Sequence, residues 1–175
     1  EKSANFRISS KYNQTCLHEA ATKGHIDVVK ILVDRGADMN AKDFEDSTPV
    51  YFAALGNLEK KSGGHLDILR YFVDEKKADV RQRTSDGNTL LHAAATSGPL
   101  DTVKYLVEKK GLDINAKDNN GYTIIFDAVS AGQLDIFRYL LEEKNADFRS
   151  ASRWDETCLH EAAKKGYIDM VKALV

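Results

Sequence analysis

The chain of 175 residues lacks an excess of either charge and lacks any long apolar run. Its 25 basic and 27 acidic residues are well mixed and leave a formal charge of −2, so no basic stripe indicates a nucleic acid or an anionic membrane as partner. No stretch approaches the roughly 20 apolar residues of a membrane helix, and the first residues, EKSANFRISS, lack a signal peptide's apolar core. With 42% hydrophobic residues, the sequence predicts a soluble globular chain without membrane insertion.

Cysteine is scarce, because only Cys16 and Cys158 are present. They hold the same position in two copies of a repeated segment, four repeats apart. At about 8 to 10 Å per layer of packed helices, their sulfur atoms should lie tens of ångströms apart, whereas a disulfide requires Cα atoms within roughly 7 Å. We expect two reduced, half-buried packing residues. Free thiols favour a reducing compartment, the cytoplasm, with the nucleus or a host-cell cytosol as alternatives.

Motifs for catalysis, metals and cofactors are also missing. The pair His18-Glu19 resembles the start of the H-E-x-x-H zinc motif, but Thr22 stands where the second histidine is needed, and the matching pair in the last repeat fails in the same way. No glycine-rich phosphate loop follows a predicted strand, and no cysteines cluster. We therefore predict that the chain is not an enzyme and binds no metal and no cofactor.

What the sequence does have is an internal repeat. Residues 1–33 align without a gap on residues 143–175, with 21 of the 33 positions identical. Each repeat opens with a threonine whose hydroxyl can cap a short apolar helix, at Thr15, Thr48, Thr89, Thr123 and Thr157. The spacings of 33, 41, 34 and 34 residues give a period near 33. A segment of this length cannot bury its own apolar face, so the copies must stack on one another.

Two further signals mark the helices of the repeats. A glycine is expected to end the first helix in the left-handed conformation, at Gly24, Gly98, Gly132 and Gly166. A second helix follows at once, with an aspartate in its first turn at Asp27, Asp67, Asp101, Asp135 and Asp169. Since negative charge there complements exposed N–H groups, we interpret these aspartates as helix-end residues and not as a site.

Segments such as GADMNAKD at 36–43 and GLDINAKD at 111–118 follow the second helices. Together with openings such as TCLHEAA and TLLHAAA, they resemble the ankyrin repeat pattern over essentially the whole chain. The resemblance implies an all-α repeat solenoid, in which helix-turn-helix units are joined by β-hairpin-like loops, called fingers below.

The resemblance also assigns a structural role to the histidine of the opening turn, which hydrogen-bonds around that turn. The histidine is present as His18, His92 and His160, whereas Tyr51 and Phe126 replace it in the second and fourth repeats. We expect the two turns without it to be slightly looser, and no activity to depend on it.

On this pattern the single domain 1–175 divides into five units after a first segment, 1–12, that holds the tail of a preceding repeat and the first finger. The units are 13–44, 45–85, 86–119, 120–153 and the incomplete 154–175. The second carries an insertion near 56–63 between its helices, which we interpret as a tolerated surface loop in preference to a partner-specific element. Neither end shows a polar capping repeat, so we expect further ankyrin repeats in the full-length chain.

For function, the resemblance implies a non-catalytic scaffold that binds a partner protein or peptide on a concave face formed by fingertips and inner helices. Four of the five fingertips carry an aromatic residue, and Trp154 is the preferred anchor because tryptophan is enriched in binding hot spots. Acidic residues on the same face favour a basic or amphipathic partner. The predicted binding residues are Tyr12, Gln14, Glu19, Phe44, Glu45, Phe52, Asp86, Asn88, Asn120, Tyr122, Asp127, Arg153, Trp154, Glu156 and Glu161.

Two alternatives stay open. The fingertips can be simple polar loops in which an aromatic such as Tyr12 or Phe44 packs on the neighbouring finger. The array can also be a spacer or targeting segment of a larger enzyme, toxin or effector whose activity lies elsewhere. Binding of a nucleic acid or a small molecule is disfavoured, because neither a basic patch nor a pocket motif is present.

Overall fold

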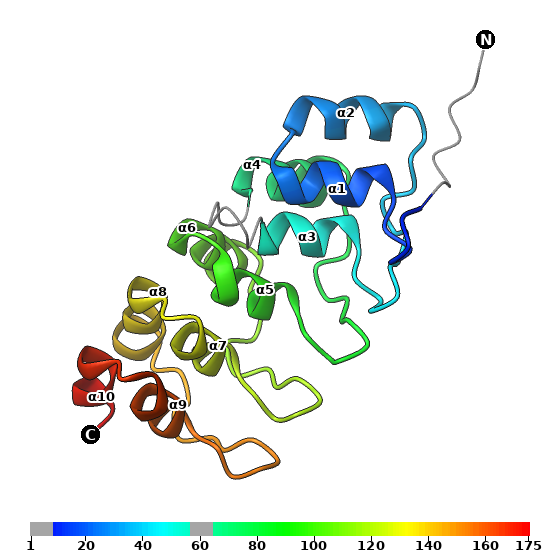
Figure 1. Ribbon diagram of the computed structural model, residues 1–175. Helices are drawn as coiled ribbons and strands as arrows, with labels where there is room; N and C mark the ends of the chain where they lie inside the picture. Colours follow the sequence, from blue (N-terminus) through cyan, green and yellow to red (C-terminus); the bar gives the residue numbers. More distant parts are fainter. Residues whose placement is uncertain (1–8, 57–64) are drawn as a thin grey trace.

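A computed structural model describes residues 9–56 and 65–175 (Figure 1). The insertion predicted near 56–63 lies outside these residues except for its first position, and so do residues 1–8. The α-helices are α1 (Cys16–Lys23), α2 (Ile26–Asp34), α3 (Pro49–Leu55), α4 (Leu66–Arg70), α5 (Leu90–Ser97), α6 (Leu100–Lys104), α7 (Ile124–Ser130), α8 (Leu134–Arg138), α9 (Cys158–Lys165) and α10 (Ile168–Leu174).

Three of the second helices do not end as α-helices. α4, α6 and α8 continue directly into single π-helical segments, η1 (Tyr71–Glu75), η2 (Tyr105–Lys109) and η3 (Tyr139–Glu143). The sequence pattern predicts the position of each second helix correctly but not this widening of its last turn. A π-helical turn shifts the side chains that follow it around the helix axis. In this chain it accompanies a repeated set of contacts between neighbouring units, described below.

The helices form two stacked layers. The inner helices α1, α3, α5, α7 and α9 pack successively against one another, and each packs against the outer helix of its own unit. Figure 1 shows the pairs as one row with the fingers all projecting to the same side. Within the described residues, extended pairing is limited to two isolated bridges, Ser9–Thr15 and Lys117–Thr123. The predicted all-α repeat solenoid is therefore confirmed.

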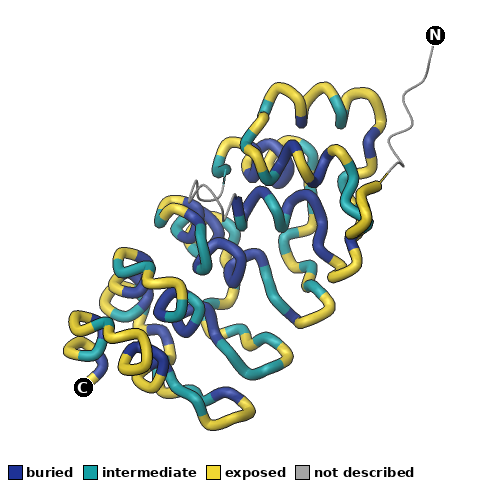
Figure 2. Tube along the Cα trace, viewed as in Figure 1, coloured by how far each residue is buried: buried dark blue, intermediate teal, exposed yellow. Residues whose placement is uncertain are grey.

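One continuous apolar core runs through all five units. Its members include Leu17, Val50, Leu91 and Ile125 of the inner helices, which are at most 2% exposed. Figure 2 shows that burial is concentrated along the inner helices, while the tips of the fingers are exposed. Because each unit covers the apolar face of the next, the stack supplies the burial that a single 33-residue unit cannot.

All five opening threonines are the N-cap residues of inner helices, as predicted. In the first unit the N–H of Thr15 donates to Nδ1 of His18 at 3.1 Å, and Nε2 of His18 lies 3.1 Å from the carbonyl of Ser47 in the next finger. His92 repeats this arrangement. Since Nδ1 accepts and Nε2 faces a carbonyl, the bonding selects the neutral ring with its proton on Nε2. The histidine therefore ties its own turn to the following finger, which confirms its structural role.

Acidification should weaken this tie. Burial lowers the pKa of both His18 and His92 below the usual value of 6.5. The unfolded chain therefore takes up protons first, and the stability contributed by these rings is complete above pH 6.5 and is lost as the pH falls below it. The loss of stability between pH 7.5 and pH 5.5, measured by urea unfolding, should be smaller for His92→Phe than for the wild type, because the variant lacks one of the two titrating rings. Phe126 in the fourth unit shows that phenylalanine fits this turn. An equal loss in both proteins would contradict the assignment.

The helix-ending glycines fulfil the prediction at three of four positions. Gly24, Gly132 and Gly166 have φ values of 78°, 72° and 72°, in the left-handed region. The prediction is wrong for Gly98, whose φ of −73° and ψ of 159° are extended. The cause is Pro99, because a residue before proline is driven away from helical conformations. Glycine serves a different purpose there, since a Cβ at position 98 would lie 2.6 Å from the carbonyl oxygen of Ala94.

Lys77 occupies a left-handed position, with φ of 60°, where the first and third units have Gly36 and Gly111. The Cβ atom of lysine is sterically strained in this conformation, whereas glycine has no Cβ atom. Lys77→Gly should therefore raise the free energy of unfolding by about 0.5 to 1 kcal/mol and the melting temperature by about 2 °C. Lys117→Gly, at a position without positive φ, should lower the melting temperature and serves as the control in the same calorimetric series.

The outer helices are joined by repeated contacts that we call the outer ladder. Its tyrosines, Tyr71, Tyr105 and Tyr139, begin the three π-helical segments and are nearly buried. Two cations lie over each ring, one from the same unit and one from the unit before. The lysine of the same unit also pairs with an acid of the preceding unit, in the pairs Lys76–Asp34, Lys110–Asp74 and Lys144–Glu108. The ladder thus links consecutive units through the C-terminal ends of their outer helices.

Candidate protein-interaction surface

Each finger is held in a fixed turn by a polar residue at its base. Oδ1 of Asp43 accepts the N–H groups of Glu45 and Ser47, both at 2.9 Å. Asp118 does the same in the fourth finger, and Ser10, Thr84 and Ser152 accept comparable bonds in the others. Near each tip one residue has positive φ, at Asn13, Asp46, Gly87, Gly121 and Asp155. The fingertips are therefore positioned by their own sequence before any partner binds.

The fingertips are also joined to one another. The N–H of Phe44 donates to the carbonyl of Tyr12 at 3.2 Å, and the three later junctions, Ser85 to Glu45, Asn119 to Asp86 and Arg153 to Asn120, repeat this bond at 2.8 to 2.9 Å. The five tips thus form one continuous edge. With the inner helices it bounds a surface that we call the inner-helix face.

The predicted binding residues differ in exposure. Seven are exposed, namely Tyr12, Glu19, Phe44, Glu45, Asp86, Arg153 and Trp154. Seven are half-buried, namely Gln14, Phe52, Asn88, Asn120, Tyr122, Asp127 and Glu156, and Glu161 is buried. Gln14 and Asn120 are within hydrogen-bonding distance of Asp43 and Asp118, the aspartates at the finger bases. Phe52 contacts the His18 ring edge-on, with ring centroids 5.5 Å apart. The structure therefore places all fifteen on the fingers or inner helices, and the seven exposed ones offer the most surface to a partner.

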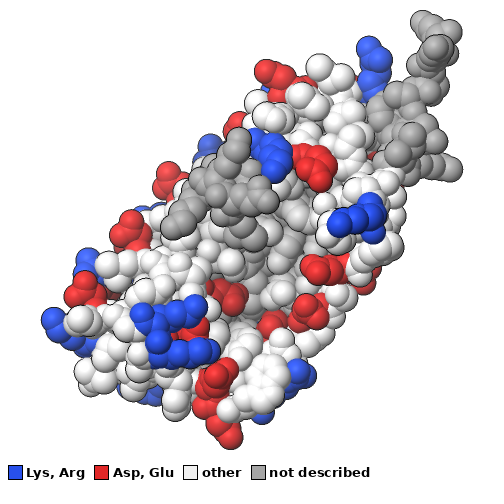
Figure 3. Space-filling view, in the orientation of Figure 1, with Lys and Arg blue, Asp and Glu red and all other residues white. Residues whose placement is uncertain are grey.

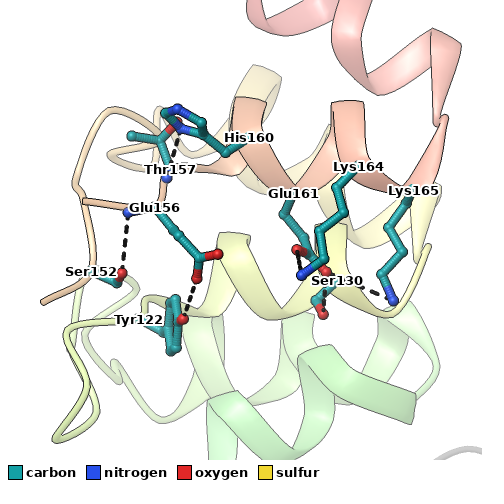
Figure 4. Close-up of polar contacts among 9 residues, drawn as sticks. All are labelled: Tyr122, Ser130, Ser152, Glu156, Thr157, His160, Glu161, Lys164 and Lys165. Carbon is teal, nitrogen blue, oxygen red and sulfur yellow. Dashed lines mark hydrogen bonds and ion pairs between the residues drawn. The ribbon is translucent and has the colours of Figure 1, made fainter. Parts of the chain in front are cut away.

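An aromatic cluster lies at the C-terminal end of this edge. Tyr122 stacks on Phe126, with ring centroids 4.1 Å apart, and lies 5.9 Å from the ring of Trp154. The hydroxyl of Tyr122 donates to Glu156 at 2.7 Å (Figure 4). The guanidinium of Arg153 lies 4.1 Å from the Trp154 ring centroid, yet Trp154 keeps 54% of its surface exposed. Tyr122 is thus a supporting residue, and Trp154 is the exposed member of the cluster.

The aromatic residues at the other end are more open. Tyr12 is 56% exposed and Phe44 is 74% exposed. Among the described residues, neither ring stacks on another aromatic ring, although the ammonium group of Lys11 lies 4.7 Å from the Tyr12 centroid. The idea that fingertip aromatics simply pack on neighbouring fingers therefore fits Tyr122 but not Phe44.

The predicted acidic residues are not all available as free negative charge. Glu161 is only 6% exposed, accepts a bond from the Ser130 hydroxyl at 3.1 Å, and lies 3.3 Å from Lys164 and 3.7 Å from Lys165 (Figure 4). The expectation that Glu161 adds free negative charge is therefore wrong, because two lysines of its own helix neutralise it. In Figure 3 acidic side chains gather along the middle of the face and its finger side, while a basic patch covers α9.

Asp127 differs from every other predicted acid. Its Oδ2 atom is closed off from water and has no hydrogen-bond partner among the described residues. Desolvation by burial, and then the nearby charge of Asp118, raise the pKa of the Asp127 carboxyl well above its usual value. Buried carboxyl groups are normally bonded or paired, so this one is an exception. The sequence identifies the acid but gives no sign that its partners are missing.

The two cysteines are free, but the expectation that both are half-buried is wrong. Cys16 is exposed because no described helix packs before α1, whereas Cys158 is buried because α7 covers the start of α9. Burial raises the pKa of the Cys158 thiol to about 12. This thiol is therefore protonated and unreactive at neutral pH.

Two further observations concern residues 9–56 and 65–175. No helix in these ranges is long and apolar enough to cross a membrane. The same ranges contain no group of three His, Cys, Asp or Glu side chains arranged to hold a metal ion.

Comparison with known protein families agrees with this geometry. The sequence model described as "Ankyrin repeats (many copies)" matches residues 91–141 and 125–175, and the model described as "Ankyrin repeat" matches residues 12–44. Together the matches span about two thirds of the chain. The chain belongs to the ankyrin repeat family. Ankyrin repeats are protein-interaction modules and are generally non-catalytic.

Similar ankyrin repeat proteins come from several groups of organisms. The NF-kappa-B inhibitor cactus of Drosophila melanogaster is 33% identical over 93 residues, which are 52% of this chain and 17% of cactus. A putative ankyrin repeat protein of Rickettsia bellii is 29% identical over 97 residues, 55% of this chain and 50% of that protein. Alpha-latrocrustotoxin-Lt1a of Latrodectus tredecimguttatus is 43% identical over 68 residues, 38% of this chain and 4% of the toxin. The chain thus aligns with at most half the length of these relatives, which is compatible with a segment of a larger protein.

Proposed function

We propose that this ankyrin repeat chain captures a partner protein or peptide on its inner-helix face and has no catalytic activity of its own. The observation that carries the proposal is the set of exposed aromatic side chains on a fixed edge. Tyr12, Phe44 and Trp154 are each more than half exposed, although their backbones are held by finger-base and finger-to-finger bonds. Exposed aromatics on a rigid backbone lose little conformational entropy on binding, and tryptophan and tyrosine are frequent hot spots.

The partner we propose is a basic or amphipathic segment of another protein. Glu19, Glu45 and Asp86 are exposed on the fingers and inner helices of the first three units. Lys164 and Lys165 lie on the last inner helix, so a basic patch lies at the end of the face opposite to these three acids. Complementary charge sets the orientation and the rate of association more than the affinity, so this distribution favours one direction for a bound segment.

The test compares two triple variants as baits. The first, Tyr12→Ala, Phe44→Ala and Trp154→Ala, removes the exposed aromatics of the fingers. The second, Val28→Ala, Ile31→Ala and Ile168→Ala, removes exposed apolar side chains of the outer helices and is the matched control. Proteins captured from a lysate by the wild type and the control, and weakened at least about tenfold with the first variant, would support the proposal. A finger variant that captures the same proteins to the same extent, with an unchanged melting temperature, would refute it.

The second candidate function is a spacer or targeting segment within a larger protein. The supporting observation is that the chain aligns with only 4% of alpha-latrocrustotoxin-Lt1a, the relative of highest identity reported above. If this function is correct, the finger triple variant introduced into the full-length protein should leave both its activity and its partners unchanged. The same full-length protein, carrying a fluorescent tag, would test the cytoplasmic location that we propose from the free thiols.

A further inference from the structure

Asp127 occupies a fixed place in a row of side chains that crosses the inner-helix face. It is the fourth residue of α7, and the same register in the other inner helices holds Glu19, Phe52, Ala93 and Glu161. Asp127 keeps part of its surface exposed, but its Oδ2 atom is closed off from water and unpartnered among the described residues. Asp127 thus keeps some surface on this face, and its Oδ2 atom has no bond among the described residues to give up.

The next unit shows what such a carboxyl group requires. Glu161, in the same register of α9, is bonded to Ser130 and lies within 4 Å of two ammonium groups, those of Lys164 and Lys165 (Figure 4). In the fourth unit the positions of these lysines are taken by Ser130 and Ala131. Ser130 already donates its hydroxyl to Glu161. Within residues 9–56 and 65–175, cations therefore pair with one acid of the row and not with the acid beside it.

The described surroundings of Asp127 do not supply a cation in place of these two lysines. None of the ion pairs formed by the described lysines and arginines includes it. On its N-terminal side the row continues with Ala93 and Phe52, which are apolar. The carboxylate of Asp118 also acts on it and, as burial does, disfavours its ionisation. Among the described residues no ion pair and no hydrogen bond to Oδ2 offsets the burial of this carboxyl group, whereas a cation supplied by a partner would offset it.

We propose that Asp127 receives a lysine or arginine side chain of the bound partner. This inference rests on the proposed function, because the cation arrives on the segment that occupies the inner-helix face. Its ammonium or guanidinium group takes the place that Lys164 and Lys165 take beside Glu161. Asp127 thereby selects a cationic residue at one register of the partner, in the middle of the face.

The experiment uses peptides selected from a random 12-residue library displayed on phage, with the wild-type chain as target. One selected peptide is also synthesised with its central lysine replaced by norleucine, or its arginine by citrulline. Affinities are measured for the wild type, for Asp127→Asn, and for Ala131→Lys, which supplies a cation within the chain at the position equivalent to Lys165. The controls are Ala131→Gln, which has no charge, and Asp135→Asn, which lies on α8.

If the inference is correct, selected peptides carry Lys or Arg at a fixed position, and Asp127→Asn and Ala131→Lys each weaken binding about tenfold, which is the size expected for one desolvated charge pair. The neutral peptide should bind the wild type about as weakly and lose nothing further with Asp127→Asn. The two control variants should bind as the wild type does. Thermal unfolding confirms that every variant is folded.

Two results would overturn the inference, and they are distinguishable from failure of the proposed function. Peptides that bind Asp127→Asn as well as the wild type, yet are lost with the finger triple variant, would refute the role of Asp127 and leave the binding face intact. Peptides that bind Asp127→Asn and the finger triple variant as tightly as the wild type, or a library that yields no binder, would refute the binding face and the inference together.

Discussion

Tyr139→Ala should lower the free energy of unfolding by about 3 to 5 kcal/mol, the range for removing a large buried aromatic side chain. The Tyr139 ring is 2% exposed and belongs to the outer ladder. Lys104 and Lys144 lie over it, at 5.2 and 5.3 Å from the ring centroid, and its hydroxyl donates to Glu108 at 3.0 Å. Truncation therefore removes buried apolar area, two cation–π contacts and a hydrogen bond between the third and fourth units at once.

Tyr139→Phe separates these contributions. It keeps the ring and both cations but removes the hydroxyl, so we expect a loss of only about 1 kcal/mol. Glu108→Gln should cost less than 1 kcal/mol, because the Lys144–Glu108 pair at 3.0 Å is partly exposed and such pairs contribute little singly. Urea unfolding followed by circular dichroism checks all three variants. A Tyr139→Ala variant as stable as Tyr139→Phe would show that the ring is not a structural link between units.

The sequence is sufficient to predict the repeat architecture, because its signals act within one unit. Threonine N-caps, first-turn aspartates and apolar periodicity each depend on residues a few positions apart, and all five threonine caps are confirmed. The one local failure, Gly98, has a local cause in Pro99, which imposes an extended conformation on the residue before it. The dipeptide Gly98-Pro99 is itself a signal in the sequence for an extended residue at this helix end.

The contacts between units could not be predicted in the same way. Tyr71, Tyr105 and Tyr139 recur at equal spacing, but the sequence does not show that a cation from the unit before lies over each ring. The pairing of Glu161 with Ser130 likewise crosses from one unit to the next. Exposure at the fingertips depends on the same geometry, which is why the sequence places both Tyr122 and Trp154 at fingertips but does not show that Tyr122 is half-buried and Trp154 exposed. Whether the predicted residues bind a partner remains a prediction.

Asp127→Ala should raise the stability of the chain at neutral pH by about 1 to 3 kcal/mol, the cost of leaving a buried polar group without a partner. Ala93 shows that alanine is accommodated at this register, where it is fully packed. The control is Asp135→Ala, which removes an exposed first-turn aspartate of α8 and should slightly destabilise the chain. Chemical denaturation at pH 7.5 measures both changes, and a loss of stability for Asp127→Ala would show that the carboxyl group has a bond within the free chain.

The pH dependence of this gain has a definite sign. Since the pKa of Asp127 is raised in the folded chain, the folded state binds more protons than the unfolded state from pH 3.8 upwards, until the folded carboxyl group also ionises. Wild-type stability therefore falls as the pH rises through this window, and the advantage of Asp127→Ala should grow with it. Binding of a ligand can compensate for the stability that this group costs the free chain, because a ligand that binds only the folded chain stabilises the folded state. An Asp127→Ala variant that is more stable alone but binds the cationic peptide less tightly would show this trade-off directly.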